Sequence, residues 1–306
     1  MRALVTGASG FVGRHLCDHL AASGDEVVAA DRTSHHSAAI VDITDADSTT
    51  DLVSDVKPDV VYHLAGWSDV GASWRDPVGV LRANAEGTLN VLEASRLASV
   101  GRVLVISSAD VYGIVAEDDL PITEGHPLRP VSPYAASKTA ADFLALQAWL
   151  GHGLDVVRVR AFNHLGPGQS DRFVASAIAS RIAANELDGS DLVPVGNLAA
   201  RRDFTDVRDV VRAYRLLVEL GTAGEVYNVC SGKAVAVQQL ADLLLGLARR
   251  PMRLVVDPDR YRPVDVPVVL GDASRLHAAT GWRPSIELER TASDLLAYWR
   301  DVTPHR

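Results

Sequence analysis

Short runs of apolar, β-branched residues alternate with longer amphipathic stretches in the first half of the chain. The apolar runs predict strands over 3–6, 26–30, 59–63, 102–107 and 155–160. The stretches between them predict helices over 11–22, 84–98 and 135–150. Strands that alternate with helices indicate βαβ units, so the fold class is α/β, with a doubly wound parallel sheet that helices cover on both faces.

The second half of the chain is less regular. It carries Gly- and Pro-rich loops at 166–169 and 194–197, a strand-like run at 225–229, a helical stretch at 237–248 and an irregular loop at 257–263. We therefore predict a main domain over 1–162 and a smaller α/β region over 163–306 that binds the substrate. Segments near 203–230 are expected to return to the main sheet.

A glycine-rich turn connects the first predicted strand to the first predicted helix. Its sequence is TGASGFVG, with glycines at 7, 10 and 13, and Asp31 ends the second strand 18 residues further on. In a Rossmann-type fold, such glycines let a pyrophosphate approach the helix N-terminus, and the acidic residue binds a ribose 2′-hydroxyl. The alternative is a structural turn with a capping aspartate. Asp42 could line the adenine or serve only as a turn residue.

Three residues later in the chain predict acid–base chemistry. Tyr134 and Lys138 are four apart in a helical stretch and so share a face, where the ammonium is expected to lower the pKa of the phenol. Ser108 follows an apolar run, at the carboxyl end of a parallel strand, where ligands bind. The alternative for the Tyr/Lys pair is an ordinary solvated helix face.

Composition narrows the choice of function. The 306 residues are 47% hydrophobic and 23% charged with a net charge of −9, which suits a soluble globular protein and disfavours a nucleic-acid binder. The sequence contains no apolar run of membrane-spanning length, and it opens directly on a strand, so we expect neither a membrane segment nor a secretory leader. Cys17 and Cys230 have no metal or redox spacing, so we expect no metal site and a cytoplasmic protein with reduced thiols.

The motifs together resemble the extended short-chain dehydrogenase/reductase family that acts on nucleotide sugars (the NAD-dependent epimerase/dehydratase type). The matching segments cover almost the whole chain in family order: TGASGFVG (6–13), HLAG (63–66), NAEGTLNVLEA (84–94), SSADVYG (107–113), SPYAASK (132–138), RAFN (160–163), RRDFTDV (201–207) and RPVDVP (262–267). Segments 63–74, 162–169, 195–214 and 225–232 are most similar to members that reduce GDP-linked 4-keto-6-deoxy sugars.

The resemblance implies a role for particular residues. The catalytic set would be Ser108, Tyr134 and Lys138. NAD(H) or NADP(H) would be held, besides Tyr134 and Lys138, by Gly7, Gly10, Phe11, Val12, Gly13, Asp31, Arg32, Asp42, Ile43, Leu64, Ala65, Gly66 and Asn84. The nucleotide sugar would contact Ser68, Val70, Ser73, Ser108, Asp110, Asn163 and Val174, and Arg202 and Arg262 would neutralise its diphosphate. His164 is expected to be structural, and Asp203 and Asp206 to order the arginine loop.

The implied reaction is reduction of the 4-keto group of GDP-4-keto-6-deoxy-D-mannose by NAD(P)H, which gives GDP-D-rhamnose. The alternatives are a GDP-mannose 4,6-dehydratase and a nucleotide-sugar 4-epimerase, because the fold does not choose between them. A dehydratase needs further acid–base groups after Ser108, where this chain has Ala109 and Asp110. A more remote alternative is a dinucleotide-binding regulator without catalytic activity, but such a protein would be expected to lack the Tyr/Lys pair. The resemblance also implies a homodimer that pairs helices 84–98 and 135–150 across a two-fold axis.

Overall fold

The computed structural model describes residues 1–33, 39–258 and 266–305. Its largest element is a parallel sheet of seven strands in the order β10-β6-β5-β4-β1-β2-β3. Their bounds are β1 Arg2–Thr6, β2 Glu26–Asp31, β3 Ala39–Ile40, β4 Val60–His63, β5 Arg102–Ser108, β6 Val156–Ala161 and β10 Val226–Val229. The predicted α/β class and doubly wound parallel sheet are confirmed.

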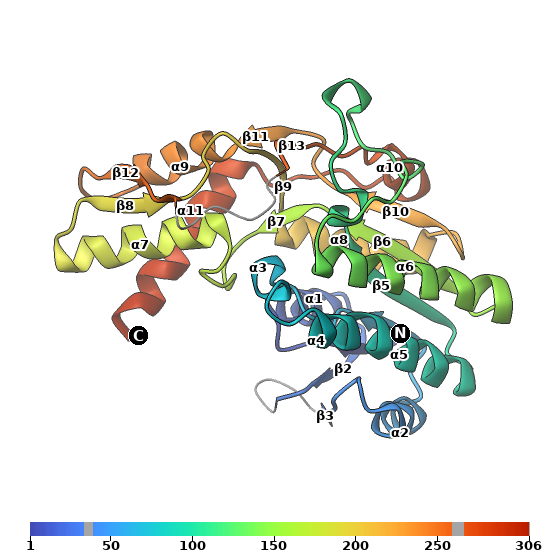
Figure 1. Cartoon of the computed structure of the whole chain (residues 1–306). Coiled ribbons are helices and arrows are strands. Elements are labelled where there is room, and N and C mark those ends of the chain that lie inside the picture. The colour runs from blue at the N-terminus through green and yellow to red at the C-terminus, as the bar shows by residue number, and fades with distance from the viewer. Residues whose placement is uncertain (34–38, 259–265, 306) are drawn as a thin grey trace.

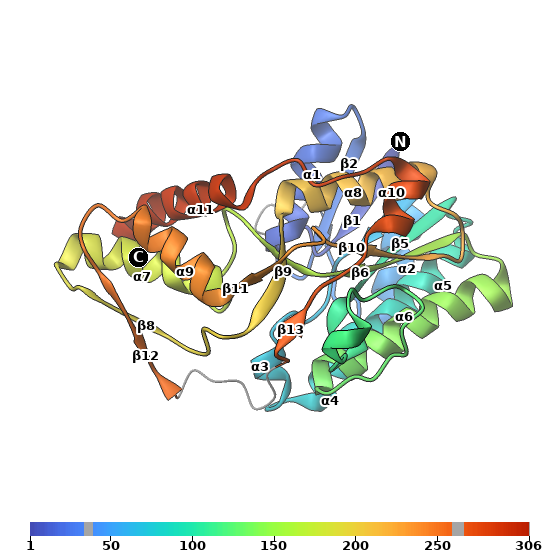
Figure 2. The same cartoon turned by 90° about the horizontal axis from the view of Figure 1, so that it is seen from above.

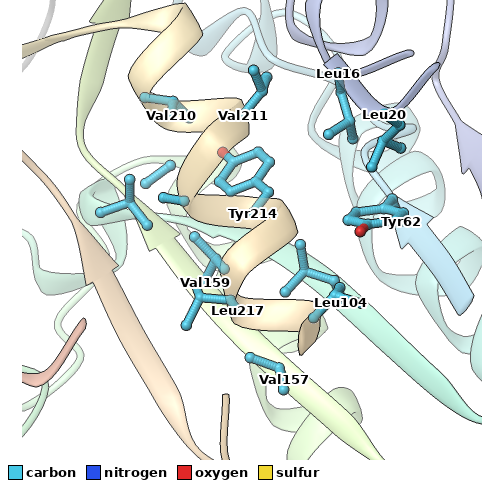
Figure 3. Close-up of a cluster of buried hydrophobic side chains, with 14 of the residues drawn as sticks. Leu16, Leu20, Tyr62, Leu104, Val157, Val159, Val210, Val211, Tyr214 and Leu217 are labelled. Carbon is cyan, nitrogen blue, oxygen red and sulfur yellow. The ribbon is translucent and has the colours of Figure 1, made fainter. Parts of the chain in front are cut away.

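Helices cover both faces of this sheet (Figure 1). One face carries α1 (Phe11–Ala22), α8 (Val207–Leu220) and α10 (Ser274–Thr280), and the other carries α2 (Ala46–Val56), α5 (Gly87–Leu97) and α6 (Pro133–His152). Figure 3 shows the core of the first face, where Leu16 and Leu20 of α1 and Tyr214 of α8 point toward strand residues. Each such aliphatic side chain contributes about 1.5–3 kcal/mol when it is fully buried.

The second half of the chain builds a smaller lobe, seen on the left in Figures 1 and 2. Its core packs three helices, α7 (Val174–Asp188), α9 (Val237–Gly246) and α11 (Leu288–Val302), against the two-stranded pair β8 (Leu192–Val195) and β12 (Arg253–Val256). The short 3-10 helix η5 (Thr303–His305) follows α11. A further sheet joins β7 (Asn163–Leu165), β9 (Arg201–Asp206), β11 (Ala234–Ala236) and β13 (Val268–Val269).

Three segments of the second half lie with the main sheet and not with the smaller lobe. Helix α8 packs beside α1, α10 packs beside α8, and β10 pairs with β6 in parallel register at the sheet edge. The chain therefore crosses between the two parts several times, which places both walls of the space between them on segments far apart in sequence. The division into domains at residue 162 stays a prediction.

Short elements follow the strand ends and shape this space. After β4 come α3 (Val70–Ser73), α4 (Pro77–Leu81) and the π-helical turn η1 (Arg82–Glu86), and after β5 come the 3-10 turns η2 (Ala109–Tyr112) and η3 (Glu117–Asp119). Aspartate side chains cap α3 and α4, since Asp69 accepts from Ala72 N at 2.9 Å and Asp76 from Gly79 N at 2.8 Å. Among the described residues, no helix combines the length and apolar character that a membrane span requires.

Candidate active site

A cleft of about 1050 Å³ opens at the carboxyl ends of the central strands. Strand order reverses between β1 and β4, so the turns that follow these two strands diverge and leave a crevice, which is where α/β sheets bind ligands. The opposite wall comes from the smaller lobe, including Asn163, Phe173 and Arg202. The cleft thus lies between the carboxyl ends of the main sheet and the smaller lobe, and residues of both line it.

The glycine-rich turn has the shape needed to hold a pyrophosphate. Gly7 has φ +73°, and a Cβ there would lie 2.6 Å from Ala65 N on the neighbouring turn. A Cβ at Gly13 would overlap the carbonyl oxygen of Gly7, so α1 can pack this closely only with glycine. No side chain caps the N-terminus of α1 at Gly10, and its first N–H groups face the cleft lined by Phe11 and Val12. These residues therefore fit a bound dinucleotide.

Asp31 lies at the end of β2 beside this turn and lines the cleft. Its Oδ2 accepts a hydrogen bond from Ser9 N at 2.9 Å, and its Oδ1 accepts from Arg32 N at 2.7 Å. The carboxylate therefore orders the glycine turn as well as presenting negative charge to the cleft. This second role was not predicted from the sequence.

The candidate catalytic side chains come together as predicted. Helix α6 begins at Pro133 with Ser132 as its N-cap, which places Tyr134 and Lys138 on adjacent turns facing β5. Lys138 Nζ donates to the carbonyl oxygen of Ile106 at 2.8 Å, and Ser108 hydrogen-bonds the Tyr134 hydroxyl. All three residues line the cleft. They converge where a reacting carbonyl could meet both hydroxyl groups.

Burial is the main cause of the pKa shifts of Tyr134 and Lys138. It raises the pKa of the Tyr134 phenol well above its ordinary value, the Asp110 carboxylate adds to the rise, and the hydrogen bond with Ser108 offsets part of it. Burial also lowers the pKa of the Lys138 ammonium to about 8. The expectation that Lys138 lowers the pKa of Tyr134 is wrong for this structure, because desolvation raises that pKa and the group that partly offsets the rise is Ser108. Tyr134 is therefore a protonated acid throughout the neutral range.

Most of the residues predicted to bind a cofactor or substrate line the cleft. Those that do are Gly7, Gly10, Phe11, Val12, Gly13, Asp31, Arg32, Asp42, Ile43, Leu64, Ala65, Gly66, Ser68, Val70, Asp110, Asn163 and Arg202. Arg202 donates from Nη1 to the carbonyl oxygen of Arg201 at 2.9 Å. Arg262 lies outside the described residues. Which of these residues touch a ligand stays a prediction.

Three predicted residues do not line the cleft. Ser73 is fully buried, where its hydroxyl donates to Val70 O at 2.7 Å and accepts from Tyr134 N at 3.2 Å. Asn84 is also buried: it accepts from Trp67 N at 2.7 Å and donates to Ser137 Oγ at 2.8 Å. Val174 packs against the core of the smaller lobe. Ser73 and Asn84 thus support the cleft without lining it, since their hydrogen bonds connect α6 to the segment after β4.

Sequence reasoning missed several residues that line the cleft. Among them are Trp67, Trp74, Gln169 and the pair Asp69 and Arg172, whose Oδ2 and Nη1 lie 3.5 Å apart and connect the two parts of the chain. His164 stacks on Phe11 with ring centroids 6.1 Å apart, so β7 packs on the first residue of α1, the helix that follows the glycine turn. A guide was available for these residues, because Trp67, Asp69, Trp74 and Gln169 lie within the matching segments 63–74 and 162–169, and Arg172 follows the second.

Asp203 is buried beside Arg202 and serves the loop geometry, as predicted. Its carboxylate accepts from Ser231 N and Gly232 N at 2.7 and 2.9 Å and from Gly271 N at 3.2 Å. It therefore ties β9 to the two loops beside it. Among the described residues, no group of three or more His, Cys, Asp or Glu side chains is arranged to hold a metal ion.

The chain resembles known proteins in both sequence and fold. A sequence model of the GDP-mannose 4,6-dehydratase family matches residues 4–295. The chain belongs to this family. It is 42% identical to GDP-6-deoxy-D-mannose reductase of Pseudomonas aeruginosa over 97% of both chains. Its structural relatives are the extended short-chain dehydrogenases of the epimerase and dehydratase type, as the sequence predicted.

Two solved structures illustrate that likeness. The structure of RMD from Pseudomonas aeruginosa complexed with NADPH has a TM-score of 0.87 and 39% identity, and it covers 98% of this chain and 99% of that one. The UDP-glucose 4-epimerase of Thermus thermophilus in complex with NAD has a TM-score of 0.89 at 28% identity, with the same coverage of both chains. The fold is thus shared by a protein complexed with NADPH and by an epimerase complexed with NAD.

Proposed function

We propose that the chain is an NAD(P)H-dependent reductase that converts GDP-4-keto-6-deoxy-D-mannose to GDP-D-rhamnose. The observation that carries this proposal is the convergence of Ser108, Tyr134 and Lys138 in a cleft that also contains the glycine turn. The 42% identity to a GDP-6-deoxy-D-mannose reductase over 97% of the chain supports the choice of substrate.

The chain's own residues account for the proton chemistry. When bound, the reduced nicotinamide supplies a hydride to the 4-keto carbon. Tyr134 donates its phenolic proton to the forming alkoxide, and Ser108 hydrogen-bonds the same oxygen. Lys138 supplies positive charge next to the resulting phenolate. Arg202, together with Arg262, would bind the diphosphate, because guanidinium groups match phosphate oxygens.

The proposal is tested by offering the purified protein a panel of GDP-, UDP- and dTDP-sugars, including 4-keto-6-deoxy forms. We expect stoichiometric oxidation of NAD(P)H with GDP-4-keto-6-deoxy-D-mannose, followed at the absorbance of the reduced nicotinamide. Product analysis would identify a 4-epimerase by interconversion of two sugars without net loss of the cofactor. Tight dinucleotide binding without turnover of any sugar would support a regulator instead.

The dehydratase is the second candidate because of Asp110. Its carboxylate lines the cleft and is near enough to raise the pKa of Tyr134, so it could move a further proton. We expect no 4-keto-6-deoxy sugar to form from GDP-mannose and NAD(P)⁺ in the absence of a reductant. Formation of that product would contradict the reductase assignment. Asp110→Asn should retain most of the reductase activity, because the proposed proton donor is Tyr134.

A second prediction concerns the choice of dinucleotide. The Asp31 carboxylate can accept a hydrogen bond from a ribose 2′-hydroxyl and would repel a 2′-phosphate, which favours NAD(H). Arg32, the next residue, also lines the cleft and could bind the 2′-phosphate, which allows use of NADP(H). Asp31→Ala should weaken binding of both forms, since Asp31 also holds Ser9 N, but it should weaken NADH more than NADPH. Fluorescence titration measures both affinities. Equal losses would show that Asp31 only orders the turn, and Asp31→Asn, which retains an acceptor, is the matched control.

A third prediction is a self-complementary homodimer formed through α5 and α6. These helices lie side by side in Figures 1 and 2, and large apolar side chains on both are exposed to solvent. Leu89 and Leu97 of α5 and Phe143 and Leu150 of α6 are between 39% and 73% exposed, which one chain alone does not explain. Light scattering at micromolar concentration should give twice the chain mass. Phe143→Asp should shift the mass toward one chain, and a monomeric wild type would refute the prediction.

We also place the enzyme in the cytoplasm. Both cysteines are free thiols in the structure, Cys230 buried and Cys17 partly buried, and thiols persist in a reducing compartment.

A further inference from the structure

Helix α6 carries a third charged residue on the stripe that bears the catalytic pair. Tyr134, Lys138 and Asp142 follow one another at intervals of four residues, so they lie one above the other on the same face. Asp142 is fully buried, deeper in the molecule than the other two, and it does not line the cleft. A buried carboxylate in this place needs a partner, because an unpaired buried charge is strongly destabilising.

The partners of Asp142 are two arginines of β6. Arg158 Nη1 donates to Asp142 Oδ1 at 2.7 Å, and Arg160 Nε donates to Oδ2 at 2.9 Å. Both guanidinium groups are themselves buried. The catalytic helix is thus fixed to the sheet at one definite height and rotation, since a shift along its axis would separate these charges.

Arg160 carries the connection onward to the turn that follows β5. Its Nη1 donates to the Tyr112 hydroxyl at 3.0 Å and to Glu124 O at 3.1 Å, and its guanidinium lies 5.1 Å from the centroid of the Tyr112 ring. Tyr112 is the last residue of η2, the 3-10 turn that Ser108 caps and that contains Asp110. The connection therefore reaches the turn that presents Ser108 to the cleft.

The Tyr112 hydroxyl is also held from the other side. It donates to Asn228 Oδ1 of β10 at 2.7 Å, while Asn228 N donates to Glu124 Oε1 at 2.8 Å and its Nδ2 to Ile122 O at 2.9 Å. Asn228 and Tyr112 are both buried. The Tyr112 hydroxyl thus joins the turn that Ser108 caps to Arg160, whose guanidinium binds Asp142 of the helix that carries Tyr134. Both bonding directions of the hydroxyl are in use.

We propose that the buried network Asp142–Arg160–Tyr112–Asn228 is a positioning device that sets the relative placement of Tyr134 on α6, Ser108 at the end of β5 and Asp110 on η2. Tyr112 is its central residue, and it acts on the reaction only through these neighbours. The inference rests on the proposed function, because it gives the aligned hydroxyls of Tyr134 and Ser108 the task of holding one substrate oxygen. Misplacement of reacting groups by as little as 1 Å can cost about 10²-fold in rate.

Tyr112→Phe is the decisive variant. It removes the bridging hydroxyl and keeps the buried ring, whereas Asp142→Asn would leave two buried guanidinium groups without their carboxylate and is expected to unfold the chain. The matched control is Tyr62→Phe, because Tyr62 is equally buried and its hydroxyl has no hydrogen-bond partner among the residues that the structure describes. Tyr62 packs in the core between the sheet and α1, as Figure 3 shows.

For Tyr112→Phe we expect kcat for reduction of the keto sugar to fall about 10- to 100-fold while KM and the dinucleotide Kd stay near the wild-type values. Tyr62→Phe should leave kcat unchanged. Equal behaviour of the two variants, or a Tyr112→Phe loss confined to the melting temperature, would overturn the proposal.

Hydrogen exchange provides a readout that needs no substrate. In Tyr112→Phe, exchange should rise in peptides that cover 108–113 and 133–138 and stay unchanged in α7, whereas Tyr62→Phe should show neither local change. The hydrogen-exchange measurement tests the positioning role even if the wild type reduces a different sugar or none. Unaltered exchange at 108–113 would contradict the positioning role, and absence of wild-type reduction alone would contradict only the proposed function.

Discussion

Tyr134→Phe should lower the rate of keto-sugar reduction by roughly 10²–10⁴-fold, the usual contribution of a general acid. The variant loses the transferable proton and keeps the ring. Because Tyr134 is buried, the phenylalanine ring should fill the same space in the protein. Binding of the dinucleotide and of the GDP-sugar should therefore survive. Steady-state kcat and equilibrium titration of both ligands measure the two effects separately.

The control for this variant is Tyr298→Phe. Tyr298 lies on α11 in the smaller lobe, where it packs against Trp299 and lines no part of the cleft. It tests whether loss of a tyrosine hydroxyl is harmful in itself. A Tyr134→Phe enzyme with near-normal turnover would move the acid role elsewhere, and Asp110, the next ionisable group at that end of the cleft, would be the first to examine.

Burial and the Asp110 carboxylate both raise the pKa of Tyr134, so its phenol stays protonated at neutral pH. The phenol can therefore donate its proton to a forming alkoxide. Asp110 acts on the acid through its negative charge, in addition to lining the cleft.

The sheet and the glycine turn were predictable because their signals are local. Val60–His63 and Arg102–Ser108 are short β-branched runs buried on both faces, and each is followed by residues that turn toward the cleft. Gly7 and Gly13 have a recognisable spacing because each glycine meets a backbone atom that excludes a Cβ. Tyr134 and Lys138 are also neighbours within one helix. The signal of each feature can therefore be read within one segment of the sequence, although Gly7 packs against Ala65 of a distant turn.

The smaller lobe was harder to predict because its strands are short and pair across long separations. Strand β7 pairs Asn163 with Phe204, and β11 pairs Ala234 with Asp203, so no periodicity within one segment indicates the partner. The ion pair of Asp69 and Arg172 also joins residues about a hundred positions apart. Its charges look like ordinary surface residues in the sequence.

Ser73 and Asn84 show a different limit of sequence reasoning. Their segments match the family motifs, which indicates that they are near the site but not which way their side chains point. The structure turns Ser73 Oγ toward Tyr134 N and Asn84 toward Trp67 N, behind the cleft wall. A motif shows where a residue lies in the chain. The hydrogen bonds of the folded protein show whether its side chain is already paired internally or can bind a ligand.

Lys138→Met should lower the rate of reduction by roughly 10²-fold or more, because the phenolate that forms on Tyr134 loses its neighbouring positive charge. Lys138 is buried, so no solvent cation can replace it, and the Nζ bond to Ile106 O is lost as well. Lys233→Met is the matched control, since Lys233 is an exposed lysine whose nearest acidic partner is the surface residue Glu287. Its rate should equal that of the wild type.

The pH dependence separates Lys138 from Tyr134. Burial lowers the pKa of Lys138 to about 8, so its ammonium is complete at pH 6–7 and is lost as the pH rises through about 8. The pKa of Tyr134 is raised, so its proton is still present there. In the wild type and in Lys233→Met, kcat/KM for the keto sugar should be flat near pH 6–7 and fall about tenfold per pH unit above about 8. Lys138→Met should lack this falling limb; if the limb persists in that variant, the titrating group is not Lys138.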